Sequence, residues 1–425
     1  MRGALWIQAL KDRSENASEN QVSVPLAFAV ITGHICKLFL RYSNPTEVHR
    51  RFFGMQCTAE SFLGYLEHRE SNVSYRSVSL IIIWVSSLYS FTSAACTTAC
   101  LSGAKGPLIT KSYDWHSTAG LVMVNKAGVK KKAFLVGPGI AAEWTSQYAS
   151  VTFNQYGREM PNGGMNTAGL VVEVMWLAET KTPAIDERPA ITELQWIQYQ
   201  LDNYATLKQV VENAPKIRVS KVYGQVHYMV CERSGRCATF EYLNGALVTN
   251  TGPALPAPVL TNHNYRDSVR YLKQHKRFGG TNKPKRGPGS LDRFTRAATF
   301  VEDYPQKATV TNGFDLLDQV SQGKYSVWNI VYDPNELRVY FRTLDSLSVK
   351  SVALKRFDPS CTSPVKTIDI NTNRSGDISR YMVDYTLEEN RSLVTKVFRQ
   401  LGGLPSILTL AITGYPERQI CTIGR

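Results

Sequence analysis

From Cys96 onward, the sequence is divided into short apolar runs that Gly, Pro and Lys residues separate from one another. The first runs are ACTTACL, PLITKSYDW, AGLVMVNKAG and KKAFLV, followed by ASVTFNQYG and GGMNTAGLVVEVMWL. Short apolar runs bounded by turn residues are typical of β-strands. We therefore expect this part of the chain to begin as β-sheet.

Helical patterns follow the first strands. Residues 191–213 carry apolar side chains at helical spacing, and Pro215 ends the pattern. The sequence also predicts helices at 291–303 and 314–321, and a hairpin whose turn is the Asp-Pro-Asn sequence at 333–335. Blocks of strands thus alternate with blocks of helices, which indicates one α+β domain of antiparallel sheets covered by helices.

The composition indicates a folded protein, since 43% of the 425 residues are hydrophobic and 20% are charged. The formal net charge of +14 would suit a nucleic-acid-binding protein, but no basic helix or finger pattern accompanies it. The segment 273–290, KQHKRFGGTNKPKRGPGS, has six basic residues and no acidic one. We expect it to be a solvated loop, and nucleic-acid binding through this loop is an alternative function. No metal-binding spacing such as CxxC or HxxxH occurs.

Residues 77–91, SVSLIIIWVSSLYSF, form the most apolar stretch of the chain. It is shorter than the about 20 residues that span a bilayer, but it has the length of a signal-peptide core. Arg76 precedes it, and Ser93 and Ala95 occupy the small-residue positions of a signal-peptidase site. The sequence therefore predicts a signal peptide at 76–95 and an exported protein, periplasmic or secreted, with no stable membrane anchor. A buried strand is the alternative interpretation.

Residues 1–75 are an uncertain leader, because signal peptides are about 15–30 residues long and this segment precedes one. It contains a second apolar stretch, PLAFAVITGHICKLFL, but no clear domain pattern. Our hypothesis is that translation starts downstream of Met1. Met55 would give a leader of more ordinary length.

Cleavage after Ala95 would leave Cys96 with a thiol and a free α-amine on one residue. Ordinary pKa values are about 7.7–8.0 for the amine and about 8.5 for the thiol, so the amine can take the thiol proton without a histidine. Alternatively, Cys96 is a lipoprotein cysteine, whose acylation would block this chemistry. Lipoprotein signals favour Leu at the position that Ser93 occupies, so we prefer the free cysteine.

Five motifs occur in an order that resembles the choloylglycine hydrolase family, which comprises bile salt hydrolases and penicillin V acylases. They are CTT at 96–98, KSYDW at 111–115, GGMNTAGL at 163–170, LTN at 260–262 and SLDRF at 290–294. The resemblance extends from Cys96 to about Thr343 and assigns 96–425 to one N-terminal-nucleophile hydrolase domain. It implies a four-layer αββα sandwich that hydrolyses the C–N bond of a linear amide through a thioester acyl-enzyme. It implies no cofactor, a small-molecule substrate and, because family members are commonly homotetramers, a homotetramer.

The resemblance also implies roles for individual residues. Cys96 matches the nucleophile, Asp114 the carboxylate that holds its α-amine, and Asn262 a side-chain donor of the oxyanion hole. Arg293 matches an arginine beside the nucleophile, where a cation favours the thiolate. The backbone N–H of Trp176 matches the second oxyanion donor.

Two departures from the family pattern bear on the substrate. Trp176 stands where bile salt hydrolases usually have Asn, and together with Trp115 it resembles Gram-negative penicillin V acylases, some of which deacylate N-acyl homoserine lactones. Two indoles suit a flat or aliphatic acyl group better than a steroid, and conjugated bile salt hydrolysis is the alternative activity. Lys111 replaces the arginine of the best-known members; it keeps the charge but loses the bidentate geometry.

His116 and His263 adjoin Asp114 and Asn262, which leaves a Cys-His mechanism open. An α-amine base makes a histidine unnecessary, so we interpret both as supporting or surface groups. The test is that His→Ala variants keep most activity.

The remaining cysteines suggest structure rather than catalysis. Cys100 would share a strand face with Cys96 and is interpreted as a core residue. Cys231 and Cys237 flank the turn-like ERSGR sequence and either form a disulfide or remain unbridged. Cys361 and Cys421 could also pair, but no pattern indicates it.

Overall fold

The computed structural model describes residues 95–423, apart from 136, 305 and 404–405. The chain divides into two units, residues 1–92 and 93–425, and the described residues belong to the second. The predicted leader at 1–75 and all of the predicted signal peptide except Ala95 lie outside the described residues. In the part of the chain that is described, no helix has both the length and the apolar composition that crossing a membrane requires.

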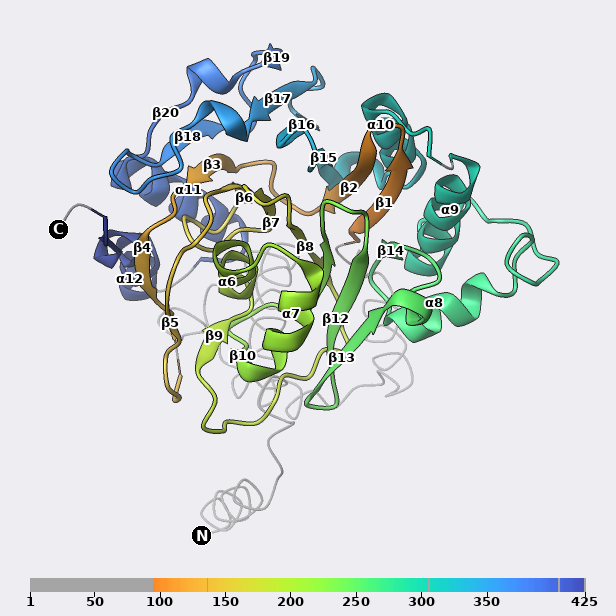
Figure 1. The fold of residues 1–425 in the computed structure, drawn as a ribbon, viewed down its shortest axis with the longest axis horizontal. Helices are drawn as coiled ribbons and strands as arrows, with labels where there is room; N and C mark the ends of the chain where they lie inside the picture. Colours follow the sequence, from red (N-terminus) through yellow and green to blue (C-terminus); the bar gives the residue numbers. More distant parts are fainter. Residues whose placement is uncertain (1–94, 136, 305, 404–405, 424–425) are drawn as a thin grey trace, which may run out of the picture. The chain divides into compact units, whose positions relative to one another are not determined.

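Two mainly antiparallel sheets form the centre of the domain (Figure 1). The first sheet has seven strands in the order β14-β1-β2-β15-β16-β17-β19, and the second has nine in the order β13-β12-β11-β8-β7-β6-β3-β18-β20. The strands of the first sheet are β1 (Thr97–Gly103), β2 (Gly106–Asp114), β14 (Val259–Leu260), β15 (Ser326–Asp333), β16 (Arg338–Thr343), β17 (Lys350–Ala353) and β19 (Gly376–Asp377). Those of the second are β3 (Leu121–Asn125), β6 (Ser150–Asn154), β7 (Gly163–Asn166), β8 (Val171–Trp176), β11 (Val226–Cys231), β12 (Cys237–Leu243), β13 (Ala246–Thr251), β18 (Lys366–Asp369) and β20 (Val383–Asp384).

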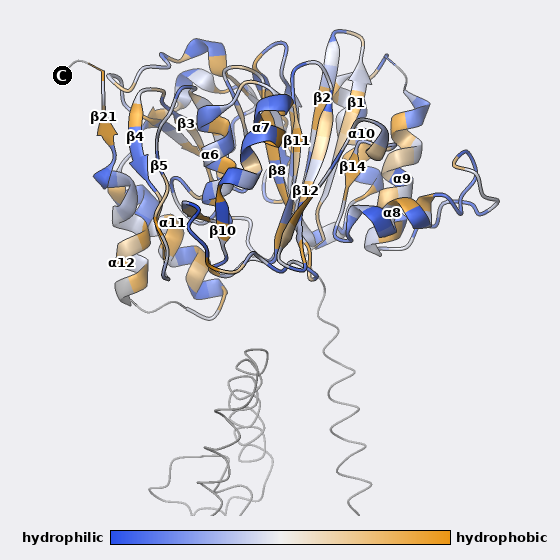
Figure 2. Cartoon of the chain, turned by 60° about the horizontal axis from the view of Figure 1, so that its bottom comes forward, coloured by the Kyte–Doolittle hydropathy of each residue, from blue (hydrophilic) through white to orange (hydrophobic). Residues whose placement is uncertain are grey.

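Alternation along β8 shows how the two sheets pack. Val171 and Met175 belong to the core that the sheets share, whereas Val172 and Val174 belong to a second core on the outer face. Successive side chains of a strand point to opposite faces, so a strand that is apolar on both faces must lie between two packed layers. Figure 2 shows these apolar strands gathered at the centre, with β2 and β14 opposite β8, β11 and β12.

Helices cover both outer faces. On the second sheet lie α6 (Gln195–Asn203) and α7 (Leu207–Asn213), and on the first lie α9 (Ser290–Asp303) and α10 (Val310–Gln319) (Figures 1 and 2). Helix α8 (Tyr265–Leu272) packs against α9. Toward the C-terminus, α11 (Leu387–Gln400) contributes Leu393 and Val397 to a small core with Met123 of β3, and α12 (Ser406–Gly414) follows it. The order helix, sheet, sheet, helix confirms the predicted αββα sandwich.

One predicted helix is wrong. Residues 191–213 form strand β9 (Ala190–Thr192) followed by α6 and α7. The break falls at Tyr204, which is extended at φ −126° and ψ 143°. Thr206 then caps a new helix: its side chain accepts a hydrogen bond from the Gln209 N–H, and the Gln209 side chain accepts one from the Thr206 N–H. This reciprocal capping satisfies helix-terminal N–H groups, so the helix restarts although the apolar periodicity is continuous.

Most other predicted elements agree with the structure, but in the run KKAFLV the strand β4 (Val129–Lys132) ends at Lys132, and 133–135 lie outside it. Helix α9 covers the predicted 291–303, and α10 begins four residues before the predicted 314. Strands β15 and β16 form the predicted hairpin around Asp333, which pairs with Arg338. The basic segment 273–290 connects α8 to α9, and most of its residues are exposed.

Candidate active site

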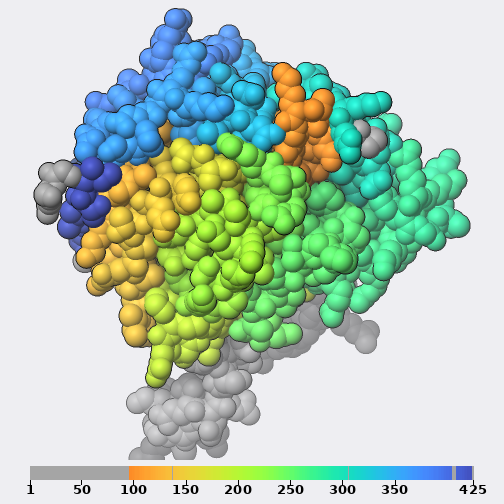
Figure 3. Space-filling model, viewed as in Figure 1, coloured from red at the N-terminus to blue at the C-terminus, as the bar shows by residue number. Residues whose placement is uncertain are grey.

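Cys96 and Asp114 are brought together by the pairing of β1 with β2. The register places Thr97 opposite Ser112, so Cys96 lies just before β1, beside the end of β2. Only 3% of Cys96 and 1% of Asp114 is exposed. In contrast, Ser102 and Lys105 at the hairpin turn are exposed, and Figure 3 shows this orange segment at the molecular surface.

Arg293 connects the start of β1 to the loop that carries Asn262. From the first turn of α9, its Nη1 donates hydrogen bonds to the Cys96 carbonyl oxygen at 2.7 Å and to Thr97 Oγ1 at 2.6 Å. Its Nη2 donates to Asn262 Oδ1 at 2.8 Å. A buried cation is disfavoured near a helix N-terminus, so its position is explained by these bonds rather than by the helix. The guanidinium therefore fixes both Cys96 and Asn262.

The contact with Arg293 also sets the orientation of the Asn262 amide. Because Oδ1 accepts from the guanidinium, Nδ2 points the other way, and it donates to the Trp176 carbonyl oxygen at 2.8 Å. An amide nitrogen carries two hydrogens. The second has no acceptor among the described residues and remains available to a substrate oxygen.

The backbone of Trp176 faces the same space. Leu177 N–H donates to the Gln225 carbonyl oxygen, and Trp176 pairs with Val226 in the β8–β11 register. Since hydrogen-bonded and non-bonded pairs alternate in an antiparallel ladder, the N–H and C=O of Trp176 point away from β11. On that side β7 pairs with β8 only as far as Glu173. The Trp176 N–H is therefore free of the ladder and lies beside the Asn262 amide, as in an oxyanion hole.

The thiol of Cys96 is not activated while Ala95 remains attached. Burial raises the pKa of Cys96 above its ordinary value, and the nearby charges of Lys111 and Arg293 only partly oppose this effect. In the intact chain the nitrogen of Cys96 belongs to a peptide bond and cannot act as a base. The uncut site thus has a protonated thiol and no internal proton acceptor on the same residue.

Asp114 has one carboxylate oxygen that is not used. Ser112 Oγ donates to its Oδ1 at 2.7 Å, but Oδ2 is buried and has no hydrogen-bond partner among the described residues. Burial raises the pKa of Asp114, although the charge of Arg293 opposes it. A buried acceptor without a donor is unfavourable. An α-ammonium group formed at Cys96 is a cation that could satisfy it.

Lys111 lies in the interior rather than on a substrate-facing surface. Its Nζ contacts the Val174 carbonyl oxygen and Met175 Sδ, and lies 3.4 Å from Glu173 Oε2. Glu173 also accepts from the Tyr332 hydroxyl at 2.5 Å. Lys111 therefore brings positive charge close to the thiol while Glu173 compensates it. Glu173 was not predicted from the sequence, in which its only indication is a charged residue within the apolar run VVEVMW.

The two predicted pocket residues belong to a row of aromatic rings. The centroids of Trp115 and Trp176 lie 6.2 Å apart, and both side chains are half-buried. Tyr113 extends the row on one side, with its centroid 6.4 Å from that of Trp115. Tyr223 extends it on the other side, 6.3 Å from Trp176, and was not predicted from the sequence. This row offers an apolar surface beside the Asn262 amide and the Trp176 backbone.

The two histidines that the sequence left open, His116 and His263, are not hydrogen-bonded to Cys96 in the described part of the chain. His116 is exposed, and its ring packs against Trp115 and Tyr325. Neither His116 nor His263 makes a hydrogen bond to Cys96, Asp114 or Asn262 among the described contacts. This geometry favours the α-amine over a histidine as the base.

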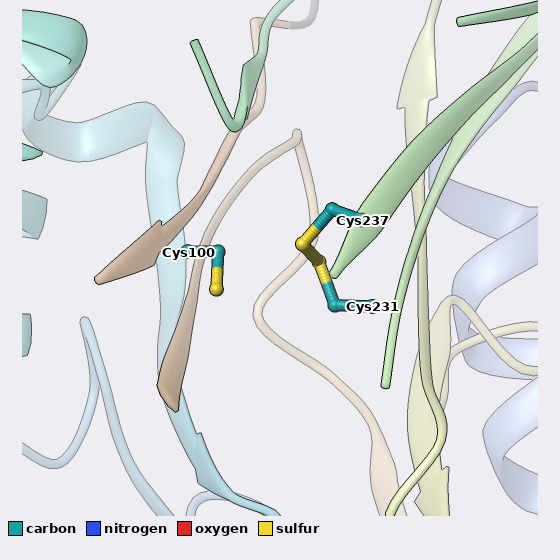
Figure 4. Close-up of side chains that lie close together, drawn as sticks. All are labelled: Cys100, Cys231 and Cys237. Carbon is teal, nitrogen blue, oxygen red and sulfur yellow. A yellow bond between two sulfur atoms is a disulfide. The ribbon is translucent and has the colours of Figure 1, made fainter. Parts of the chain in front are cut away.

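Of the six cysteines in the described part of the chain, four form disulfides and two are free. Cys231 pairs with Cys237 across β11 and β12, and Cys361 pairs with Cys421. Cys96 and Cys100 are the free, buried thiols of the described chain. Figure 4 shows Cys100 facing the Cys231–Cys237 disulfide, and the three sulfur atoms lie within 4.8 Å of one another. Cys100 therefore occupies the core between the sheets, as expected.

Comparison with known proteins finds similar sequences and structures. No family model matches the chain. The chain is 27% identical over 317 residues to a penicillin V acylase from Pectobacterium atrosepticum, covering 63% of this chain and 83% of that protein. Among solved structures, penicillin V acylase from Agrobacterium tumefaciens superposes with a TM-score of 0.61 at 24% identity, over 68% of this chain and 98% of that one. A variant of the conjugated bile acid hydrolase from Clostridium perfringens gives a TM-score of 0.55 at 15% identity, over 66% and 98% of the two chains. These matches confirm the predicted family resemblance and fold, together with the prediction that the chain is an amide hydrolase.

Proposed function

We propose that this protein hydrolyses a linear acyl amide of the penicillin V type, with Cys96 as an N-terminal nucleophile that is formed when the preceding residues are removed. The observation that carries the proposal is the buried, unpaired Oδ2 of Asp114 beside Cys96. Among the described residues, this oxygen is an acceptor without a donor. A free α-amine at Cys96 would supply the donor.

The proposed mechanism uses only groups of this chain. The α-amine takes the proton of the Cys96 thiol, and the thiolate attacks the amide carbonyl carbon. The carbonyl electron pair moves to oxygen, where Asn262 Nδ2 and the Trp176 N–H stabilise the negative charge. Collapse of this intermediate breaks the C–N bond, and the α-ammonium returns its proton to the leaving amine. Water, deprotonated by the α-amine, then cleaves the thioester and releases the carboxylic acid.

The acyl group is inferred from the aromatic row. Trp115 and Trp176 give a flat apolar wall, and Tyr223, 64% exposed, stands at its open end. Such a wall suits the phenoxyacetyl group of penicillin V, or the aliphatic acyl chain of an N-acyl homoserine lactone. The match to the sequence relative, a penicillin V acylase, supports the first of these. Conjugated bile salts are the alternative substrates.

A hydrolysis panel tests the substrate class. The assay uses a chain that begins at Cys96 after removal of an initiator Met, and it offers penicillin V, N-acyl homoserine lactones, and glycine- and taurine-conjugated bile salts. We expect kcat/KM to be highest for penicillin V or an acyl homoserine lactone. A preference for bile salts would contradict the pocket argument, and no hydrolysis of any of them would contradict the proposed function.

Export is part of the proposal. The apolar stretch 77–91 and the small residues before Cys96 support cleavage by a signal peptidase. The two disulfides suit an oxidising compartment. N-terminal sequencing of the exported protein decides the point: a free Cys96 permits the chemistry, and a blocked one would favour the non-catalytic lipoprotein.

A further inference from the structure

A buried histidine–glutamate pair lies behind the loop that carries Asn262. His227 of β11 and Glu241 of β12 are neighbours in the second sheet, one position beyond the pair formed by Tyr228 and Phe240. Both residues are buried: His227 is 0% exposed and Glu241 is 1% exposed. Their ring nitrogen Nδ1 and carboxylate oxygen Oε1 lie 2.9 Å apart. Neither residue belongs to the motifs that carry the family resemblance.

The pair makes further hydrogen bonds to both ends of one short loop. His227 Nε2 lies 2.7 Å from the carbonyl oxygen of Thr261, the residue before Asn262. Both carboxylate oxygens of Glu241 accept from the N–H of Tyr265, at 2.9 and 3.1 Å, where α8 begins. The segment between Thr261 and Tyr265 is thus held at each end by one buried pair.

The hydrogen-bonding capacity of the imidazole shows how firmly the loop is held. A carbonyl oxygen can only accept, so His227 Nε2 must carry a hydrogen and donate it to Thr261. Nδ1 contacts the carboxyl group of Glu241, which also accepts from the Tyr265 N–H. Hydrogen bonds to a carboxylate are shorter and stronger than neutral ones. Loss of either partner would leave the other buried and incompletely paired.

Only Asn262 and its immediate neighbours lie between these two anchors. Asn262 N–H donates to Ser290 Oγ at 2.8 Å, and Ser290 Oγ donates to Thr261 Oγ1 at 3.0 Å. Together with the contacts of the Asn262 amide to Arg293 and Trp176, the backbone and the side chain of this residue are fixed from several sides. An oxyanion donor requires this, because a displacement of about 1 Å can cost about a hundredfold in rate.

We propose that His227 and Glu241 are positioning residues of the oxyanion hole: they hold the Thr261 carbonyl and the Tyr265 N–H so that Asn262 Nδ2 meets the developing charge. The inference rests on the proposed function of Asn262 as oxyanion donor. It gives His227 of β11 and Glu241 of β12 a role in setting kcat.

Substitutions that preserve one half of the pair test this assignment. His227→Gln keeps a donor near the Thr261 carbonyl, and His227→Asn keeps one near Glu241 only. We expect His227→Asn to lower kcat about tenfold to a hundredfold with KM within about twofold, and His227→Gln to lower it less. Glu241→Gln, which keeps the size of the side chain, should behave like His227→Gln. His275→Gln is the matched control, because His275 is also a buried histidine but lies beyond the end of α8.

Alkylation of Cys96 separates positioning from a general structural effect. Iodoacetamide reacts with the thiol without forming an oxyanion, so its rate at Cys96 should stay within about twofold in all four variants. A fall in alkylation parallel to kcat, or an unchanged kcat in a folded His227→Asn protein, would overturn the inference. Thermal unfolding verifies that each variant is folded.

The positioning inference can still be tested if the wild type hydrolyses none of the panel substrates. That outcome would refute the proposed function alone. The positioning inference would then be decided by crystal structures of His227→Gln and His227→Asn, in which Asn262 Nδ2 should leave the Trp176 carbonyl oxygen in the second variant and keep this contact in the first. An undisturbed Asn262 in both variants would overturn it.

Discussion

Cys96 and Cys100 are two buried thiols four residues apart, one just before β1 and one within it, yet their surroundings differ completely. Cys96 lies beside Asp114, with the charges of Lys111 and Arg293 acting on its sulfur. Cys100 faces a disulfide in the core, and burial alone raises its pKa to about 12. Burial raises the pKa of both thiols, and only at Cys96 do nearby positive charges, those of Lys111 and Arg293, oppose this rise. A free amine at residue 96 would therefore add a base to a site that already holds Asp114, Lys111 and Arg293, whereas burial alone affects the pKa of Cys100.

Replacing each of the two cysteines by alanine in turn should give the largest difference in kcat. Cys96→Ala in the chain that begins at residue 96 should lower kcat for penicillin V by more than about a thousandfold, because the nucleophile is lost. Cys100→Ala should leave kcat within about twofold, since it removes only a core sulfur. Initial rates at saturating substrate, with circular dichroism as a check on folding, measure both. Equal losses in the two variants would contradict the distinction between the sites.

Replacing Asp114 should have the next largest effect. Asp114→Asn keeps the shape of the side chain but removes the charge that would hold the α-ammonium. We expect kcat to fall about a hundredfold because the amine is no longer oriented toward the thiol. Ser112→Ala, which deletes only the donor to Oδ1, should cost a few-fold under the same assay. A variant Asp114→Asn with full activity would show that the carboxylate has no role in orienting the amine.

The pH dependence of alkylation compares the two thiols in one protein. Burial raises the pKa of Cys96 in the uncut chain, so its thiolate fraction, and hence its alkylation rate, should still be rising above pH of about 8.5. Removal of the preceding residues should move this rise to lower pH and speed alkylation at pH 7 about tenfold, because the amine then accepts the proton. Cys100 should remain unreactive in both chains until much higher pH. Peptide mass mapping of the alkylated protein distinguishes the two sites, and identical Cys96 profiles in both chains would count against the amine.

Removing the charge of Lys111 should have the smallest effect on the thiol. Lys111→Met alone leaves Glu173 buried without its cation and should destabilise the fold by about 3–5 kcal/mol. The double variant Lys111→Met, Glu173→Gln should regain most of that stability. Its Cys96 should still react with iodoacetamide a few-fold more slowly at pH 7 than the wild type, because Lys111 lowers the pKa of the thiol. A double variant with wild-type reactivity would assign Lys111 to folding alone.

Part of this site could be predicted from the sequence because its residues lie in short motifs whose order resembles a known family. Cys96, Asp114, Asn262 and Arg293 were found in this way, and the structure brings them together through the β1–β2 pairing and the first turn of α9. The sheet order could not be read from the sequence, since it depends on which strands pair. Strands after Thr343 extend both sheets although their sequence carried no clear pattern.

The supporting contacts could not be predicted for the same reason. Lys111 meets Glu173, 62 positions later in the chain, only because the two sheets face each other. His227 and Glu241 meet across two strands, and their sequence signal was no more than a polar residue in an apolar run. The break between α6 and α7 shows the converse, because local capping at Thr206 outweighed a continuous apolar period.

The central claim concerns the amino group of Cys96, and the most direct test measures processing and activity together. The exported protein is purified, intact mass gives the fraction of molecules that begin at Cys96, and the same sample is assayed with penicillin V. Variants that slow cleavage, such as Ala95→Leu, should lower both quantities in proportion. Full activity from molecules that retain residues ahead of Cys96 would contradict the account.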